Sequence, residues 1–275
     1  MMPMITKNRG DSITNLLATV TTSEKRKNLL ILLLNGPRLW EEIKDLLNVT
    51  ASGMLPQIKI LESEGLVVKE GQQFQLTDAG QIVAFHLEQF DRTLRVIDQQ
   101  KKYWQEHDIR ALPRDFFLRL GDLKKTQVNE AEMEEILEPH AQSLDMIMKS
   151  KKVSGISPVV HPVYPELFRS LAQDGREVRI ILSKNAFTKI RKEYYDLFLE
   201  GLQYENAHLS VYEDDMRFST IVTEKNFCME LFTKTGLFDS KRDLVSIDPM
   251  AVKWGEDIFS YFFDRSHPVK KDGQY

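Results

Sequence analysis

The pattern of apolar and polar positions in residues 23–80 begins with three short helices. Ser23 is a good helix N-cap, and a first helix is expected from there through the aliphatic run Leu29–Leu34. The segments Asn35-Gly36-Pro37 and Asn48-Val49-Thr50 are typical of helix ends and turns. They separate the first helix from a second at residues 38–47 and a third at residues 52–63.

A strand hairpin is expected directly after the third helix. Leu66 and Val68, and then Phe74 and Leu76, are expected to point inward, and Gly71 lies at the turn between the two runs. Three helices followed by such a hairpin, or wing, predict a winged helix-turn-helix domain at residues 23–80. Residues 1–22 are expected to form an N-terminal tail.

The third helix is expected to be the recognition helix of this domain. Met54, Ile58 and Leu61 share one helical face and should pack inward, which leaves the opposite face for DNA. Recognition helices meet bases mainly through their N-terminal half, and the outer residues of a wing can reach phosphate or the minor groove. Pro56 is expected in the first turns of the helix, where its missing N–H is tolerated. The predicted DNA-binding residues are Thr50, Ser52, Leu55, Pro56, Gln57, Lys59, Lys69, Gln72 and Gln73.

A long helix is expected next, from residue 78 to about residue 104. Five apolar residues in it recur at spacings of 4, 3, 4 and 3, as in a coiled-coil seam: Val83, Leu87, Phe90, Leu94 and Ile97. Such a seam fits either a helix packed on the core of its own subunit or a linker and dimerisation helix at residues 81–110. We favour the homodimer, because a two-fold dimer matches a two-fold operator.

The second half of the chain, residues 111–275, alternates strand and helix patterns and predicts an α/β domain with some antiparallel strands. A kinked helix is expected at residues 130–148 and a final helix at residues 249–265. Strands are expected at residues 153–160, 177–182, 208–212, 218–222 and 227–232, and helices at residues 164–173 and 186–202.

Small ligands bind such sheets beyond the carboxyl ends of the strands. The residues expected at those ends, and so the candidate effector-binding residues, are Ser157, His161, Ser183, Lys184 and Asn185. Lys184 fits an anion contact as well as a solvated loop lysine. His161 has a proline directly after it, so structural packing is an alternative to ligand contact.

Composition narrows the classes of function. The net charge is −4, and residues 1–80 hold nine basic and nine acidic residues, so DNA binding would depend on local placement of charge. The single cysteine, Cys228, excludes an internal disulfide and is expected as a core thiol, the alternative being a redox sensor. Phosphate-binding glycine loops, the Gly-x-Ser-x-Gly motif and histidine pairs at metal-ligand spacing are absent from the sequence. We therefore expect no cofactor, no metal and no enzyme activity.

No apolar run approaches the roughly 18 residues of a membrane span, and residues 1–10 lack the apolar stretch of a signal peptide. A cytoplasmic protein without membrane contact is expected.

Two longer segments carry a family resemblance. The segment T-A-S-G-M-L-P-Q-I-K-I-L-E-S-E-G-L-V with L-T-D-A-G resembles the winged-helix regulators of methanogenic archaea. The segment S-T-I-V-T-E-K-N-F-C-M-E-L-F-T-K-T-G-L-F-D and the D-P-x-A-x-x-W-G-E-x-I-F pattern at residues 248–259 resemble their methanogenesis regulatory protein domain. The resemblance covers nearly the whole chain. It implies a cytoplasmic, dimeric transcription regulator linked to methanogenesis, and it assigns no ligand.

The second half is also similar to the sensor half of archaeal sugar-responsive regulators, which is like half of a phospholipase D. The phospholipase signature H-x-K-x-x-x-x-D is absent from the sequence, so that chemistry does not carry over. The predicted fold is thus an α+β winged helix-turn-helix, a linker helix and an α/β domain of the phospholipase D-half type without its catalytic motif.

Three functions remain open at this stage. The favoured one is a transcription regulator that binds double-stranded DNA and senses a small-molecule or protein effector at residues 111–275. The second is a protein-interaction subunit of the transcription machinery that uses the winged helix as a docking surface. The third is an enzyme in the α/β domain, for which the sequence offers no nucleophile–base pair.

Overall fold

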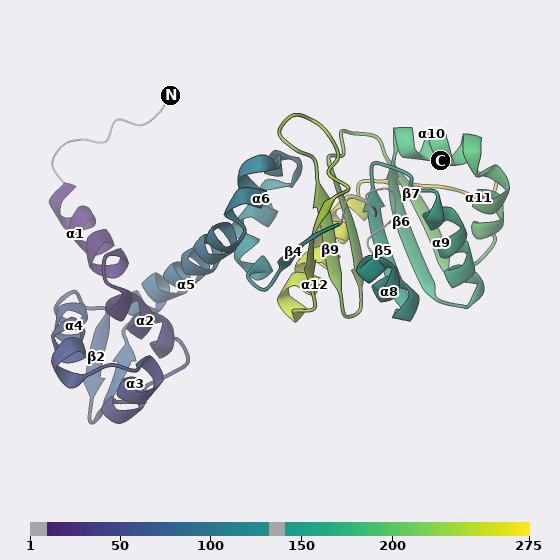
Figure 1. Ribbon diagram of the computed structural model, residues 1–275. Helices are drawn as coiled ribbons and strands as arrows, with labels where there is room; N and C mark the ends of the chain where they lie inside the picture. Colours follow the sequence, from purple (N-terminus) through teal and green to yellow (C-terminus); the bar gives the residue numbers. More distant parts are fainter. Residues whose placement is uncertain (1–9, 132–140) are drawn as a thin grey trace. The chain divides into compact units, whose positions relative to one another are not determined.

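The chain divides into two compact units, Met1–Asp91 and Arg92–Tyr275, which we call unit 1 and unit 2 (Figure 1). The computed structural model describes residues 10–131 and 141–275. Helix α5, Asp78–Gln99, contains the boundary between the units. Among the described helices, none combines the length and the apolar character that crossing a membrane requires.

Unit 1 begins with four helices: α1 (Gly10–Thr21), α2 (Glu24–Leu33), α3 (Trp40–Leu47) and α4 (Ala51–Ser63). The Ser23 side chain accepts a hydrogen bond from the Arg26 backbone N–H and caps α2, as expected. Asn48 ends α3 in the left-handed region, at φ 48°. Helix α1 lies within the segment that was expected to be a tail, so that expectation is wrong for residues 10–21.

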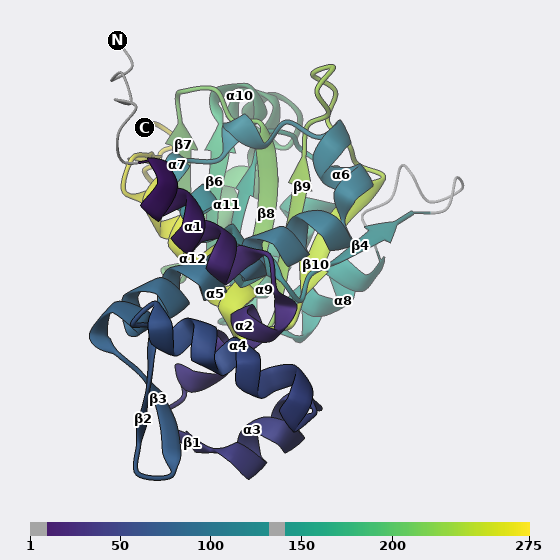
Figure 2. The same ribbon diagram turned by 90° about the vertical axis from the view of Figure 1, so that its left-hand side faces the viewer.

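The wing of unit 1 is a three-stranded sheet in the order β1-β3-β2 (Figure 2). Its strands are β1 (Arg38–Leu39), β2 (Val67–Glu70) and β3 (Gln73–Leu76). Val67 pairs with Leu76 and Lys69 with Phe74, so these four residues share one face. Leu66, Phe74 and Leu76 are buried, as expected, but Val68 is only half-buried and its neighbour Val67 is buried.

The core of unit 1 is closed around the expected face of the third helix. Met54, Ile58 and Leu61 of α4 are at most 2% exposed and pack with residues of α2, α3 and the wing. The first turns of α5 complete this core with Ala84 and Leu87.

Gly80 lies where α5 approaches the wing. A Cβ atom added there would come within 1.9 Å of the Leu66 carbonyl oxygen. This backbone contact explains the glycine of the Leu-Thr-Asp-x-Gly segment.

The expected helix at residues 78–104 is two helices. Helix α5 ends at Gln99, and α6 (Lys101–Glu106) begins after Gln100, whose backbone is not helical (φ −120°, ψ 36°). The Trp104 indole N–H donates to the Val96 carbonyl of α5 at 3.0 Å, which ties the two helices together. The short helices η1 (Ile109–Ala111), α7 (Arg114–Leu118) and η2 (Leu120–Leu123) follow.

Unit 2 is built on an eight-stranded sheet in the order β11-β7-β6-β5-β8-β9-β10-β4 (Figure 1). Strands β5, β6 and β7 are parallel, and the other neighbours pair antiparallel, as the mixed α/β prediction requires. The strands are β4 (Gln127–Glu130), β5 (Lys152–Ser157), β6 (Glu177–Ser183), β7 (Ala207–Tyr212), β8 (Phe218–Thr223), β9 (Phe227–Leu231), β10 (Arg242–Ser246) and β11 (His267–Pro268).

Helices cover both faces of this sheet. The helices α9 (Val163–Gln173), α10 (Lys184–Glu193) and α11 (Tyr195–Gly201) connect the parallel strands and pack on one face, together with α8 (Ala141–Lys149). Helix α12 (Pro249–Phe263) packs on the other face, where Trp254 and Phe259 are fully buried. Alternate residues of each strand therefore face two different helical layers.

Several elements of unit 2 differ from the expectation. Strands β4, β10 and β11 were not predicted, and the helix expected at residues 186–202 is broken at Tyr194 (φ −134°, ψ 34°). Strand β5 ends at Ser157, before the expected end at residue 160. Of the helix expected at residues 130–148, residues 132–140 lie outside the described part of the chain.

Candidate nucleic-acid interface and candidate effector site

Helix α4 presents an exposed face opposite its buried one. Ser52, Leu55, Pro56 and Lys59 are all exposed, with Leu55 at 40%. The helix has no acidic residue in its first turn, and the carboxylates that follow, Glu62 and Glu64, lie at its C-terminal end. The N-terminal half of α4 is thus the part that can approach an anion without charge repulsion.

Two of the predicted DNA-binding residues have structural partners. The Thr50 side chain accepts from the Gly53 backbone N–H at 3.3 Å and so caps α4. The Gln57 side chain accepts from Arg26 Nη1 at 2.6 Å, and Arg26 also donates from Nη2 to the Thr22 hydroxyl at 3.2 Å. Gln57 is half-buried, so it orients α4 against α2 and is a poorer candidate for base contact than its exposed neighbours.

The neighbouring helix α2 adds charge that the sequence prediction did not include. Lys25 is exposed, and its ammonium donates to the Gly53 carbonyl oxygen of α4 at 3.3 Å. This contact places a positive charge beside the N-terminal turn of α4. The contact joins residues 28 positions apart, so no local pattern in the sequence indicates it.

Pro56 is the sixth residue of α4 and lies in its second turn, within the first turns in which it was expected. At that position its missing N–H leaves the Ser52 carbonyl without its usual intrahelical donor. An exposed serine and an exposed proline thus mark a weak point in the helix, on the face available to DNA.

The three predicted residues of the wing lie at its tip. Gln72 and Gln73 are exposed, as is Lys69. The Lys69 ammonium lies 5.4 Å from the centre of the Phe74 ring, because the strand register places both side chains on one face. The side chain of Lys69 therefore lies on the same side of the wing as Phe74. It was expected on the outer side.

The residues of the predicted dimer seam divide into two groups. Val83 and Leu87 pack in the core of unit 1. Phe90, Leu94 and Ile97 are 54%, 47% and 41% exposed. Ile82 and Phe85 on the same helix are also exposed, at 64% and 55%. Phe90, Leu94 and Ile97 therefore form an exposed apolar stripe on α5, because they lie within about 60° of one another around the helix axis, whereas Ile82 and Phe85 lie on another side.

The candidate effector residues also divide. Ser157 and His161 line one cavity beside the carboxyl end of β5. Ser183 is occupied as the N-cap of α10, accepting from the Ala186 N–H, and donates to the Pro158 carbonyl. Lys184 and Asn185 are exposed and do not line this cavity; Lys184 lies 3.9 Å from Glu213.

A small polar chamber adjoins this cavity. The two share Tyr164, Ser219 and Ile221 as lining residues, and Glu230 and Cys228 of β9 line the far part. Burial raises the pKa of the Glu230 carboxyl to about 7, and the nearby Asp243 carboxylate adds to the effect against a hydrogen bond from Ser219. Burial likewise raises the pKa of the Tyr164 hydroxyl.

Sequence reasoning missed Tyr164, Ser219 and Glu230. One signal was available: Glu230 interrupts the apolar run Phe227–Phe232 of a predicted buried strand, where a carboxylate is rare without a function or a partner. Ser219 and Tyr164 carried no such signal.

Cys228 is buried, as expected, and its thiol donates to Asp243 Oδ2 at 3.1 Å. Burial and the neighbouring Asp243 raise the pKa of this thiol, so it stays protonated and unreactive. Within residues 10–131 and 141–275, no group of three or more His, Cys, Asp or Glu side chains has the arrangement of a metal site.

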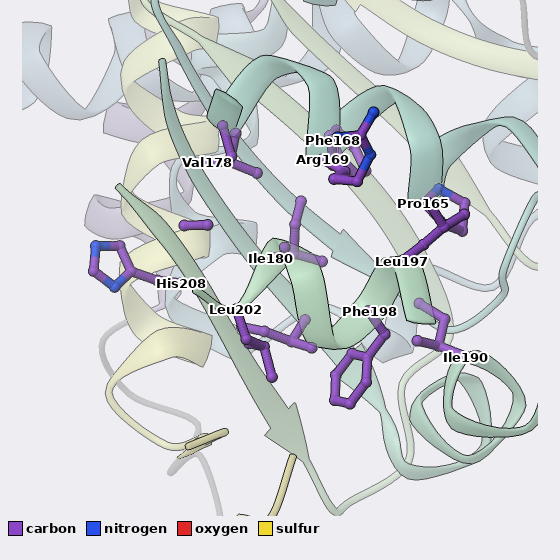
Figure 3. Close-up of a pocket in the computed structure, with 14 residues that line it drawn as sticks. Pro165, Phe168, Arg169, Val178, Ile180, Ile190, Leu197, Phe198, Leu202 and His208 are labelled. Atoms are coloured by element: carbon purple, nitrogen blue, oxygen red, sulfur yellow. The ribbon is translucent and has the colours of Figure 1, made fainter. Parts of the chain in front are cut away.

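A second, apolar cavity lies between α9, α11 and the sheet (Figure 3). Figure 3 shows Phe198 and Leu202 on one side and Ile180 of β6 on the other. This cavity shares Pro165, Phe168, Ile180 and Ile190 with the cavity that Ser157 and His161 line. The three cavities are therefore consecutive along one face of the sheet.

Comparison with known proteins relates both parts of the chain to one family. Residues 14–97 match the N-terminal domain, and residues 136–265 the middle domain, of the methanogenesis regulatory protein FilR1. The methanogenesis regulatory protein FilR1 of Methanothrix harundinacea (strain 6Ac) is 23% identical over 252 residues, which cover 90% of this chain. The match covers 56% of that relative, so the chain spans little more than half of its length.

Two solved structures are more distant. The archaeal chromatin protein TrmBL2 is 12% identical, with a TM-score of 0.42 over 94% of this chain and 99% of that one. The phospholipase D family member Nuc from Salmonella typhimurium is 11% identical, with a TM-score of 0.41 over 53% of this chain and 98% of that one. Neither likeness is close enough to support an argument about fold or function. The chain resembles the methanogenesis regulatory protein FilR1 family over residues 14–97 and 136–265.

Proposed function

We propose that this protein is a transcription regulator that binds double-stranded DNA through α4 of unit 1. The observation that carries the proposal is the exposed face of that helix. Ser52, Leu55, Pro56 and Lys59 face solvent together, while the opposite face is locked into the core by Met54, Ile58 and Leu61.

The chemistry of this face suits a major groove. The Ser52 hydroxyl can donate to or accept from a base edge, and Leu55 can contact a thymine methyl group. Lys59 and Lys25 supply positive charge for phosphate, and the positive end of the α4 helix dipole adds to it. Lys69, Gln72 and Gln73 at the wing extend the contact to the flanking backbone.

A binding measurement with single lysine variants tests this proposal. The probe is a fluorescent duplex of the DNA upstream of the protein's own gene, titrated by anisotropy at several salt concentrations. Lys59→Ala should weaken binding by about tenfold, and Lys69→Ala should reduce the slope against salt by about one. Lys149→Ala removes one exposed charge from α8 of unit 2 and is the matched control. Equal affinity of Lys59→Ala and Lys149→Ala, or no binding by the wild type at low salt, would refute the proposal.

We propose that the protein acts as a homodimer whose contact includes the apolar stripe of α5. Three large apolar side chains on one face of this helix, Phe90, Leu94 and Ile97, are 41–54% exposed. A second copy of the same stripe, related by a two-fold axis, would bury these side chains. Pairing would also double the phosphate contacts of unit 1, which holds nine basic and eleven acidic residues.

The oligomeric state tests the dimer. Phe90→Glu with Leu94→Glu should yield monomers in light scattering, because two carboxylates would enter the contact. Leu87 is unsuitable for this test, since it packs in the core of unit 1 and its loss would unfold that unit. Gln81→Glu with Gln99→Glu adds the same charge at exposed polar positions of α5 and should leave the dimer intact. A dimer that persists in the first variant would place the interface elsewhere.

We further propose that unit 2 senses an effector and that the regulated genes belong to methanogenesis. The cavity lined by Ser157 and His161 supports the first part. The name of the relative from Methanothrix harundinacea supports the second. Mapping bound sites across the host genome tests the choice of genes: a set of sites that avoids genes of methane formation would contradict it.

A further inference from the structure

Resting on the proposed sensing function, we infer that unit 2 binds a small amphipathic amine. Its apolar body would lie in the cavities between α9, α11 and the sheet, and its ammonium group would lie at Glu230.

The apolar part of the site is continuous over two cavities. Phe168, Ile180 and Ile190 line both of them, so an alkyl body could extend from Leu202 to Ile221 without leaving apolar surroundings. Arg169 at the rim is held by Glu166 at 2.7 Å and Glu200 at 2.8 Å, so its charge is already compensated. Burial of an alkyl chain here would supply most of the binding free energy.

The polar part lies at one end of these cavities. It is lined by the Tyr164 and Ser219 side chains and by Glu230, and Ser143 and Cys228 are close by. The Ser143 hydroxyl and the Cys228 thiol donate to Asp243 Oδ2, at 3.2 Å and 3.1 Å, so both donors already have a carboxylate as acceptor. Among the described residues that line this chamber there is no cationic side chain.

A half-buried carboxyl group that lines a cavity beside further carboxylates selects the charge of its ligand. The titratable groups around Glu230 are Asp243 of β10, Asp239 after β9, Cys228 of β9, Tyr164 of α9 and Tyr103 of α6. Each of these groups is neutral or negative when it titrates, but Asp239 is already paired with His107 and Arg242. Glu230 lines the chamber and Asp243 lies near it, so a ligand carboxylate would be repelled and an ammonium group attracted. A primary amine also donates three hydrogen bonds, for which Glu230, Ser219 and Tyr164 offer acceptor oxygens.

The pH dependence of binding follows from the ionisation of Glu230. An alkylamine keeps its proton between pH 6 and 8, because its pKa is near that of lysine, about 10.4. With burial holding the pKa of Glu230 at about 7, the carboxylate that attracts the amine is mostly present at pH 8 and mostly protonated at pH 6. Affinity for the amine should therefore fall about tenfold from pH 8 to pH 6, whereas affinity for an uncharged alcohol should not change.

Calorimetry on the full chain without DNA tests the inference with three probes of equal length: n-octylamine, n-octanol and n-octanoate. At pH 8, n-octylamine should bind at least tenfold more tightly than n-octanoate, and Glu230→Gln should abolish the advantage of the amine over the alcohol. Glu193→Gln, an exposed carboxylate of α10, is the control and should bind as the wild type does. Tighter binding of n-octanoate, or an unchanged preference for the amine in Glu230→Gln, would overturn the inference.

A second variant covers the possibility that Glu230→Gln does not fold. Gly201 lines the apolar cavity, and a Cβ atom added there meets no atom within 4 Å. Gly201→Leu should fill that space and weaken n-octylamine and n-octanol alike by at least tenfold, and unchanged binding of both would overturn the placement of the alkyl body. Because these titrations contain no DNA, a negative result leaves the DNA-binding proposal to its own test.

Discussion

The two units of this protein differ in where they place polar chemistry. In the described part of unit 1, Thr19 is the only polar residue that is buried, and every candidate DNA contact lies on the surface or at its edge. Unit 2 buries His107, Asp243, Ser143 and other polar side chains, and its candidate ligand groups lie inside or beside cavities. This contrast indicates that substitutions on the outer face of unit 1 can leave its fold intact. Substitutions at the candidate site of unit 2 should also affect the stability of that unit.

The largest expected effect comes from the packing of unit 1. Gly80→Ala should destabilise this unit by about 3 kcal/mol or more, because the new methyl group would collide with the Leu66 backbone, which cannot move aside as a side chain can. Urea unfolding followed by circular dichroism measures the loss, and hydrogen exchange assigns it to unit 1.

Gly201→Ala is the matched control, since its added Cβ atom meets open space. It should change stability by no more than about 1 kcal/mol. If Gly80→Ala lowered the stability no more than this control does, the packing between α5 and the Leu66 backbone would be looser than the structure indicates.

The same contrast explains what could be predicted from the sequence. The face of α4 follows from helical periodicity alone, so Met54, Ile58 and Leu61 were correctly placed inside. Leu66, Phe74 and Leu76 of the wing were also correctly placed inside, whereas the prediction for Val68 was wrong, because its pairing with Gln75 of β3 puts it on the face opposite Val67.

Unit 2 was less predictable because its candidate site joins distant segments. Tyr164, Ser219 and Glu230 meet only through the sheet order β5-β8-β9 and the position of α9. Ser157 and His161 were found from their place at a strand end, whereas Lys184 and Asn185, chosen by the same rule, are exposed outside that cavity. The rule locates an edge of the sheet, and the packing of helices decides which side chains at that edge face a cavity.

A second prediction concerns a substitution that breaks the polar network of unit 2. Asp239 Oδ2 accepts from His107 Nε2 at 2.9 Å and from Arg242, which also binds Glu106. Asp239→Asn should destabilise unit 2 by about 2 kcal/mol at neutral pH, because a buried histidine and an arginine lose their carboxylate. Urea unfolding of the two proteins at a series of pH values measures the difference.

The pH dependence gives this prediction its control. Burial raises the pKa of Asp239, but the hydrogen bonds from His107 and Arg242 outweigh burial and hold that pKa below its ordinary 3.8. A carboxyl group with a lowered pKa stabilises the fold above its unfolded pKa, and this stabilisation is lost as pH falls through the lower, folded value. The difference between wild type and Asp239→Asn should thus persist down to about pH 4 and shrink below it. A difference that disappears between pH 7 and pH 5 would show that the aspartate carboxylate is not its source.

The smallest effect is expected on the surface of unit 1, at Pro56. Pro56→Ala should stabilise unit 1 by about 1 kcal/mol, because the new N–H can donate to the Ser52 carbonyl within α4. The same change should weaken DNA binding several-fold if the proline ring and the free Ser52 carbonyl belong to the contact surface, as we propose. Ser63→Ala, at the other end of α4, serves as the control that keeps the proline. Greater stability with unchanged affinity would mean that Pro56 is dispensable for DNA binding, and it would confine the contact to Ser52, Leu55 and Lys59. Greater stability with weaker binding would show that Pro56 favours DNA binding at a cost to the stability of α4.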